Sequence, residues 1–261
     1  MSSRKEQKEQ ARLDREAKEQ QLAAQTARRR RVTIIGGVLG IALIAVVAAV
    51  VVSSGVFKSK DIKGGTEVSA RLDGIPQKGI ELGKPDAPAT IVEFADLKCP
   101  FCREFAVNGL PDLIETYIKT GKAKIIFRNL TILDGSAPGQ DSTDAATMAG
   151  AVGLQNKMWN FIDLWYVNQK DENTVYATDS YVKEIASQIP GVDVNKAFDA
   201  RESAPVKAQL DAAQAAADAR GITGTPTFLV GPTNGKLVQV EMNNDLGDIS
   251  PLTAAVDAAS P

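Results

Sequence analysis

The chain has two cysteines, and both lie in one C-x-x-C motif, Cys99-Pro100-Phe101-Cys102. Such a pair is a redox-active dithiol, an ordinary structural pair or half of a four-thiolate zinc site. The 261 residues include no histidine, which excludes Ser-His-Asp and Cys-His catalysis and every His-ligated metal site. Two cysteines alone cannot complete a thiolate zinc site or staple a fold of this size. We therefore predict a redox pair, assign no metal and no cofactor, and keep a structural pair as the alternative.

The motif lies between a predicted strand and a predicted helix. Residues 89–95, ATIVEFA, are apolar enough for a buried strand, and the apolar positions within 99–120 are typical of a helix. Pro100 suits the first helical position, where the missing N–H costs nothing. Pro111 interrupts the same pattern, so we expect a kink or a restart of the helix there.

A thiol at the start of a helix is chemically activated. The first N–H groups of a helix are unpaired and its dipole is positive there, so a thiolate is stabilised and its pKa falls. Cys99 takes the N-cap position, and Lys98 adds a nearby positive charge. Cys102, three residues on, returns to the same face. The sequence thus predicts an exposed, attacked sulfur at Cys99 and a shielded, resolving sulfur at Cys102.

A second signal lies more than 120 residues downstream, in residues 221–228, GITGTPTF. A proline that opens a strand and is framed by glycine and threonine suits a cis peptide bond at Thr225-Pro226. X-Pro bonds are cis in only about 5–6% of cases, so the trans form is expected unless the context changes this. Residues 227–230 and 236–240 are predicted to pair as a hairpin through GPTNG.

The segments LGKPDAPATIVEFADLKCPFC and GITGTPTFLVG together resemble the DsbA-like thiol:disulfide oxidoreductases. The segment QNKMWNFIDLWYVNQ, which lies between them, is similar to a helix pair of that family. The likeness covers roughly residues 75–245. It implies an α/β, thioredoxin-like fold with an inserted α-helical subdomain, and it implies that the bond before the proline of GTPT is cis.

The resemblance also implies roles for individual residues. Cys99 is the nucleophile, Cys102 is the resolving cysteine and Pro226 is the cis-proline that faces them. In the family, the loop of Thr225 and Pro226 binds an extended substrate segment through its backbone.

Glu93 stands six residues before Cys99, where many members of the family keep a buried acid beneath the active site. A buried carboxyl group with a raised pKa could shuttle the proton of Cys102. The alternative is a strand residue that forms an ion pair with Lys124 or Arg128. The sequence leaves both interpretations open.

Phe101 departs from the family pattern, because the best-known oxidases have histidine as the second residue between the cysteines. Loss of that polar donor weakens thiolate stabilisation, so we predict a less extreme oxidant. We assign Phe101 and Thr225 to substrate binding, and Pro100, Lys98 and Glu93 to the support of the redox pair.

The order of predicted elements supports the fold that the resemblance implies. A strand, a helix and a strand are followed by a block of helices, a further helix, two antiparallel strands and a last helix. With the block set aside, this is a thioredoxin-like βαβ unit followed by ββα. We therefore expect one folded domain over residues 79–261, with a helical insertion at about 139–204.

The residues before this domain predict a membrane anchor. Residues 1–31 carry ten Lys/Arg and five Asp/Glu and end in four arginines, and residues 32–52 are 21 residues without a charge. We expect a basic cytoplasmic tail, a transmembrane helix and, over 53–78, an extracytoplasmic linker. A cleaved signal peptide is the alternative, although the apolar run is longer than a usual signal core of about 7–15 residues.

These features predict a single-pass membrane protein whose catalytic domain gives disulfides to exported proteins with free thiols. The alternatives are a reductase or isomerase with the same cysteines, and a tethered binding or holdase domain without turnover. The resemblance implies a quinone-linked membrane partner, DsbB-like or VKOR-like, that reoxidises the pair. A net charge of −2 with +5 in residues 1–31 leaves −7 elsewhere, which argues against nucleic acid as a partner.

Overall fold

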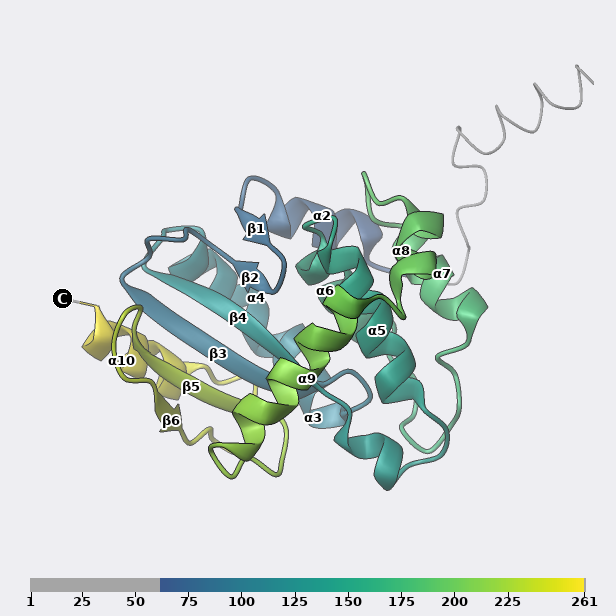
Figure 1. Cartoon of the computed structure of the whole chain (residues 1–261). Helices are drawn as coiled ribbons and strands as arrows, with labels where there is room; N and C mark the ends of the chain where they lie inside the picture. The colour runs from purple at the N-terminus through teal and green to yellow at the C-terminus, as the bar shows by residue number, and fades with distance from the viewer. Residues whose placement is uncertain (1–61, 261) are drawn as a thin grey trace, which may run out of the picture. The chain divides into compact units, whose positions relative to one another are not determined.

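A mixed β-sheet forms the centre of the folded unit (Figure 1). The computed structural model describes residues 62–260, and the chain divides into two units, 1–58 and 59–261, of which the second contains the sheet. Its strands are β1 (Gln77–Lys78), β2 (Glu81–Leu82), β3 (Ala89–Asp96), β4 (Ala123–Leu130), β5 (Thr227–Pro232) and β6 (Val238–Val240). They lie in the order β1-β2-β4-β3-β5-β6, with β3 and β4 parallel and the other neighbours antiparallel.

Strand β3 leads directly to the cysteine motif and is buried along its whole length. Its side chains alternate between two apolar cores because successive residues of a strand point to opposite faces. Ile91 belongs to the core on one face, and Val92 and Phe94 belong to the core on the other. Each buried side chain of this size stabilises the fold by about 1.5–3 kcal/mol. Packing on both faces therefore fixes the end of β3, from which the cysteine motif continues.

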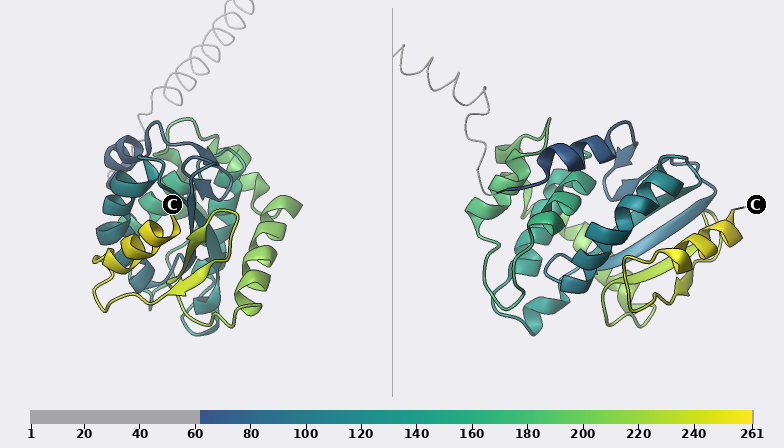
Figure 2. Two further views of the ribbon diagram at one scale, coloured as in Figure 1. Left: turned by 90° about the vertical axis from the view of Figure 1, so that its left-hand side faces the viewer. Right: turned by 180° about the vertical axis from the view of Figure 1, so that it is seen from behind.

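Helices cover both faces of the sheet, as Figure 2 shows from two further directions. Helix α9 (Ala204–Asp218) packs on β4 on one face. Helix α10 (Ser250–Ala259) packs on β3 and β5 on the other face, beside the helix that begins with α3 (Pro100–Glu104). The predicted βαβ and ββα units are therefore confirmed.

The helix after the cysteine motif changes its hydrogen-bonding pattern around Pro111, where the sequence predicts a kink or a restart. Helix α3 continues into a π-helical turn at Phe105–Gly109, the short helix α4 (Leu110–Leu113) and a second π-helical turn at Ile114–Ile118. Proline has no N–H group and cannot join the regular ladder of hydrogen bonds. Wider turns on both sides of Pro111 let the helix continue without a break.

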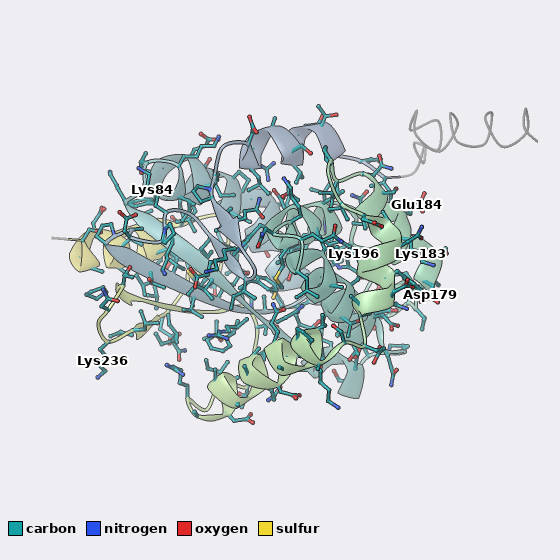
Figure 3. All side chains as sticks on the ribbon, turned by 45° about the horizontal axis from the view of Figure 1, so that its top comes forward. Lys84, Asp179, Lys183, Glu184, Lys196 and Lys236 are labelled. Carbon is teal, nitrogen blue, oxygen red and sulfur yellow. The ribbon has the colours of Figure 1, made fainter. Side chains whose placement is uncertain are left out.

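A block of helices is inserted between β4 and α9, next to the end of the sheet that carries α3 (Figure 1). It contains α5 (Asp141–Gly153), α6 (Met158–Asn168), α7 (Asp179–Ser187) and α8 (Val194–Ala200). Trp159 and Trp165 are fully buried, so their assignment to the core is confirmed. Charged side chains of α7 and α8 point away from this core (Figure 3): Asp179, Lys183, Glu184 and Lys196.

The expected linker over 53–78 is wrong in its last part, and the folded unit begins earlier than residue 79. Helix α2 (Gly65–Leu72) buries Val68 and Leu72, and Arg71 forms an ion pair of 2.9 Å with Asp163 of α6. The sequence GTEVSARL is mostly polar, so its two apolar contacts do not stand out from a tether. The predicted tail and transmembrane span, 1–31 and 32–52, lie outside the described residues. Within residues 62–260, no helix is both long and apolar enough to cross a bilayer.

Candidate active site

Cys99 caps the helix that carries Cys102. The backbone of Cys99 is extended, and Pro100 occupies the first turn of the helix. The Cys99 sulfur accepts the N–H of Cys102 at 3.5 Å. A side-chain acceptor at the N-cap satisfies one of the N–H groups that a helix start leaves unpaired. The predicted position of the motif is confirmed, and both cysteines are free thiols in this structure.

The Thr225-Pro226 loop lies against the same sulfur, although 126 residues separate it from Cys99 in the chain. The peptide bond between Thr225 and Pro226 is cis, as the resemblance implies. The Cys99 thiol donates to the carbonyl oxygen of Thr225 at 3.5 Å. Strand β5 begins one residue after Pro226 and pairs with β3, so the sheet itself brings the two halves of the site together.

The two thiols differ strongly in acidity. A hydrogen bond from the Cys102 thiol lowers the pKa of Cys99 to about 6, against the opposing effect of burial. The Thr225 side chain and the backbone N–H groups of Cys102 and Phe101 lower it further. Burial raises the pKa of Cys102 well above its usual value, and its hydrogen bond to Cys99 raises it more. At neutral pH the pair therefore carries its negative charge on Cys99.

Exposure does not distinguish the two sulfurs, which corrects the prediction of an exposed Cys99. Cys99 is 4% exposed and Cys102 is fully buried. The Thr225 loop covers Cys99 on one side, and the Gln169 amide, just after α6, donates to the Cys99 carbonyl at 3.1 Å. The asymmetry of the pair is therefore one of hydrogen bonds and charge.

Glu93 lies buried in β3 and is 2% exposed. Burial and the nearby charge of Cys99 raise its pKa to about 8. The ion-pair alternative is wrong, because Thr90 and Phe94 pair with Lys124 and Arg128, so these basic side chains point to the opposite face of the sheet from Glu93. One carboxyl oxygen of Glu93 has no hydrogen-bond partner within the described part of the chain. Its neutral form is thus favoured at pH 7, which agrees with the buried acid that the resemblance implies.

Lys98 does not present a free positive charge to Cys99. Its side chain is completely buried, and its Nζ contacts the carboxylate of Asp141 at 3.0 Å and donates to the carbonyl of Pro138. The expectation that Lys98 stabilises the thiolate by its charge is therefore wrong, because Asp141 compensates that charge. The sequence could not show this, since Asp141 lies 43 positions away at the start of α5.

Asp96, the last residue of β3, is a buried acid that the sequence analysis missed. Its carboxylate accepts the N–H groups of Lys98 at 2.8 Å and Leu133 at 3.0 Å. Its carbonyl accepts the N–H of Cys99 at 3.0 Å and the hydroxyl of Tyr166 at 3.1 Å. Asp96 therefore fixes the backbone that leads into the N-cap. An acid that ends an apolar strand three residues before a cysteine is the signal that could have found it.

Helix α6 also holds this loop through polar tips of large side chains. The Trp165 indole N–H donates to the Leu97 carbonyl at 2.7 Å, and the Gln169 amide donates to the same oxygen at 2.8 Å. These contacts explain why the segment around the tryptophans combines buried aromatic rings with hydrogen-bonding groups. The helical insertion is thus part of the site.

Phe101 is the exposed member of the motif. Its side chain is 60% exposed, whereas large apolar side chains next to it in the chain, such as Phe105, are buried. An apolar side chain in water beside a reactive thiolate offers a contact surface for another molecule. The Phe101 side chain supplies no polar group to the sulfur of Cys99. Phe101 lowers the pKa of Cys99 through its backbone N–H alone.

A dithiol at a helix start, opposite a cis-proline loop on a thioredoxin-like sheet, defines a thiol:disulfide oxidoreductase of the thioredoxin superfamily. The family model described as Thioredoxin matches residues 76–245, which is close to the range of the resemblance. The probable disulfide bond formation protein D of Bacillus cereus is 33% identical over 166 residues, covering 62% of this chain and 73% of that protein. The chain belongs to the DsbA-like thiol:disulfide oxidoreductases.

Two further relatives agree with this assignment. The disulfide bond formation protein D of Bacillus subtilis is 26% identical over 160 residues, covering 60% of this chain and 68% of that protein. The crystal structure of oxidised BdbD from Bacillus subtilis superposes with a TM-score of 0.58 at 22% identity, covering 71% of this chain and 96% of that one. At that identity the likeness supports the fold.

Proposed function

We propose that the protein is a membrane-anchored, extracytoplasmic oxidase that introduces disulfides into exported proteins. The observation that carries the proposal is the difference between the two thiols, with the pKa of Cys99 lowered to about 6 and that of Cys102 raised. Stabilising the thiolate stabilises the reduced pair, and this makes the disulfide form a stronger oxidant. The names of two relatives, probable disulfide bond formation protein D of Bacillus cereus and disulfide bond formation protein D of Bacillus subtilis, support the same direction.

The proposed reaction transfers two electrons from substrate to protein. A substrate thiolate attacks Cys99 in the Cys99-Cys102 disulfide, a bond forms between these two sulfurs, and Cys102 leaves as a thiolate that takes up a proton. A second substrate thiolate then attacks the substrate sulfur of the mixed disulfide, and Cys99 leaves as the stabilised thiolate. The substrate has gained a disulfide and the pair has become a dithiol.

The neighbouring residues have separate proposed roles in this cycle. Pro226 and Thr225 present backbone to an extended substrate segment, in the manner of strand addition, and Phe101 contacts its side chains. Glu93 is protonated near neutral pH and lies on the side of Cys102, so it supplies the proton that the leaving Cys102 takes up. Pro100 starts the helix without an unpaired N–H.

We further propose that residues 32–52 anchor the chain in the membrane, with residues 1–31 in the cytoplasm and the catalytic domain outside. The uncharged 21-residue run and the four arginines before it support this orientation. Structural disulfides are made outside the cytoplasm, which suits an oxidase at this location. A quinone-linked membrane protein, DsbB-like or VKOR-like, would reoxidise the pair.

Two measurements test the direction of the reaction. The oxidised protein should convert a reduced, unfolded two-cysteine substrate to its disulfide form, one substrate per dithiol, and thiol alkylation in cells should trap Cys99-Cys102 mostly oxidised. A mostly reduced pair would favour a reductase or isomerase. Substrate oxidation or binding that persists when Cys99 is replaced would favour a holdase that uses the same frame without turnover.

A further inference from the structure

The ion pair between Lys98 and Asp141 is buried directly beside the reactive cysteine. Lys98 Nζ lies 3.0 Å from Asp141 Oδ2, and the two side chains are 0% and 1% exposed. Withdrawing two charges from water is costly, and their attraction offsets the cost only when further hydrogen bonds complete the site. A buried ion pair therefore need not be present because it stabilises the fold. Its position beside Cys99 indicates a role at the active site.

Further hydrogen bonds complete this pair, and they come from two other segments of the chain. Lys98 Nζ also donates to the carbonyl of Pro138, in the loop before α5. Asp141 accepts the N–H of Tyr176 at 3.2 Å on each oxygen and the N–H of Ala177 at 2.9 Å. The carboxylate thus joins the active-site loop, the start of α5 and the segment between α6 and α7.

We propose that Lys98 and Asp141 form a buried clamp that holds Cys99 in its N-cap position, so that Asp141 is a positioning residue for the reacting sulfur. The proposal deepens the proposed function and rests on it for its biological meaning. It assigns the helical insertion a role in the chemistry, because the clamp ties the cysteine loop to the first turn of α5.

The geometry around Cys99 explains why such a clamp matters. The sulfur accepts the Cys102 N–H and lies 3.5 Å from both this nitrogen and the Thr225 carbonyl oxygen, which are ordinary hydrogen-bond distances for sulfur. A shift of the loop that draws the sulfur away from the helix start weakens the donation from the backbone N–H groups of Cys102 and Phe101 that favours the thiolate, and so raises the pKa of Cys99. Asp96 holds the backbone of the loop, and the Lys98 side chain links the loop to Asp141 at the start of α5.

A clamp and a free charge make the same prediction for Lys98 but opposite predictions for Asp141. If Lys98 acted on the thiolate by its charge, removing Lys98 would raise the pKa of Cys99, while neutralising Asp141 would lower it. If the pair acts by position, both changes disturb the same loop and both raise the pKa of Cys99. The sign of the Asp141 effect therefore separates the two accounts.

The experiment measures the pKa of Cys99 from thiolate absorbance in Lys98→Met, Asp141→Asn and the double variant, each against a matched protein that also carries Cys99→Ser. We expect each single variant to raise the pKa of Cys99 by about one unit. The double variant should raise it by less than the sum, because the two changes break one interaction. A lower pKa in Asp141→Asn, or no change in either single variant, would overturn the proposal.

Arg71→Met provides the matched control, because Arg71 and Asp163 form a second ion pair with one partner buried, at 2.9 Å between α2 and α6. Its loss should reduce stability but leave the pKa of Cys99 unchanged. An equal shift in this control would mean general loosening and would overturn the clamp. If Asp141→Asn does not fold, the double variant, which buries a neutral pair, carries the same test. The readout needs no substrate, so failure of oxidase activity and failure of the clamp are distinguishable.

Discussion

Among the buried carboxyl groups near the dithiol, Asp141 and Glu93 have contrasting surroundings. On the side of the helical insertion, Asp141 receives a lysine and two backbone N–H groups. On the sheet side, Glu93 forms no ion pair among residues 62–260, and its pKa rises to about 8. Similar burial thus accompanies an ion-paired carboxylate at one position and an acid with a raised pKa at the other.

The difference indicates that the two carboxyl groups have separate roles beside the Cys99-Cys102 pair. The compensated side keeps the geometry of Cys99 constant. The uncompensated side leaves a carboxyl group that changes protonation near the working pH, next to the buried Cys102. Exchanging the two environments would remove both properties, and separate variants at Lys98 and Glu93 perturb them one at a time.

The largest expected effect concerns the sulfur itself. Cys99→Ser should abolish oxidation of a dithiol peptide, because no thiolate remains for exchange. Cys102→Ala should keep Cys99 reactive and accumulate mixed disulfides with substrates, which non-reducing electrophoresis with mass spectrometry identifies. Full turnover by Cys99→Ser would contradict the assignment of the two cysteines.

On the compensated side, Lys98→Met should reduce the free energy of unfolding by about 3–5 kcal/mol, because Asp141 is left buried and unpaired. Urea denaturation at pH 7 measures this. The double variant with Asp141→Asn should recover part of the loss, because it removes the buried charge while the asparagine oxygen can still accept the N–H groups of Tyr176 and Ala177. A loss below about 1 kcal/mol, typical of a surface pair, would show that the carboxylate finds other compensation.

On the uncompensated side, the wild-type reduced protein should lose about 3 kcal/mol of unfolding free energy between pH 4.5 and pH 7 through Glu93. Glu93→Gln should not show this loss. The pKa of Glu93 is raised from 4.5 to about 8 in the folded protein. The contribution of Glu93 to the free energy of unfolding is therefore fully present below pH 4.5 and is lost as the pH rises toward 8. Glutamine has no such loss. The same variant should slow disulfide exchange at Cys102, and denaturation at the two pH values together with stopped-flow kinetics tests both statements.

The smallest expected effect is at Phe101. Phe101→His adds a polar donor near Cys99 and should lower the pKa of Cys99 by up to about one unit. This corresponds to a potential higher by at most about 30 mV. A glutathione redox titration of both proteins measures the change. A wild-type potential as oxidising as that of the strongest family members would refute the prediction of a weaker oxidant.

Local chemistry was readable from the sequence where neighbours in the chain decide it. The N-cap position of Cys99 and the irregular helical turns around Pro111 follow from residues within one or two helical turns. The resemblance supplied the cis bond before Pro226, and the apolar run at 89–95 supplied the central strand.

Contacts between distant segments were not readable. Lys98 looked like a free charge because its partner Asp141 belongs to the inserted helices. The strands β1 and β2 have two residues each, which is too short for a periodic pattern, and α2 resembled a tether. The exposure of Cys99 depends on a loop 126 residues away. These features arise from tertiary packing, which a single sequence does not display.

The most direct test of the account is the pH titration of thiolate absorbance in the reduced wild-type protein, with Cys99→Ser as the reference. One thiol should ionise with a midpoint near 6 and should be absent in Cys99→Ser. The other should remain protonated well above pH 9. A midpoint near 9 for Cys99, or a first ionisation that survives in Cys99→Ser, would contradict the assignment of the activated sulfur.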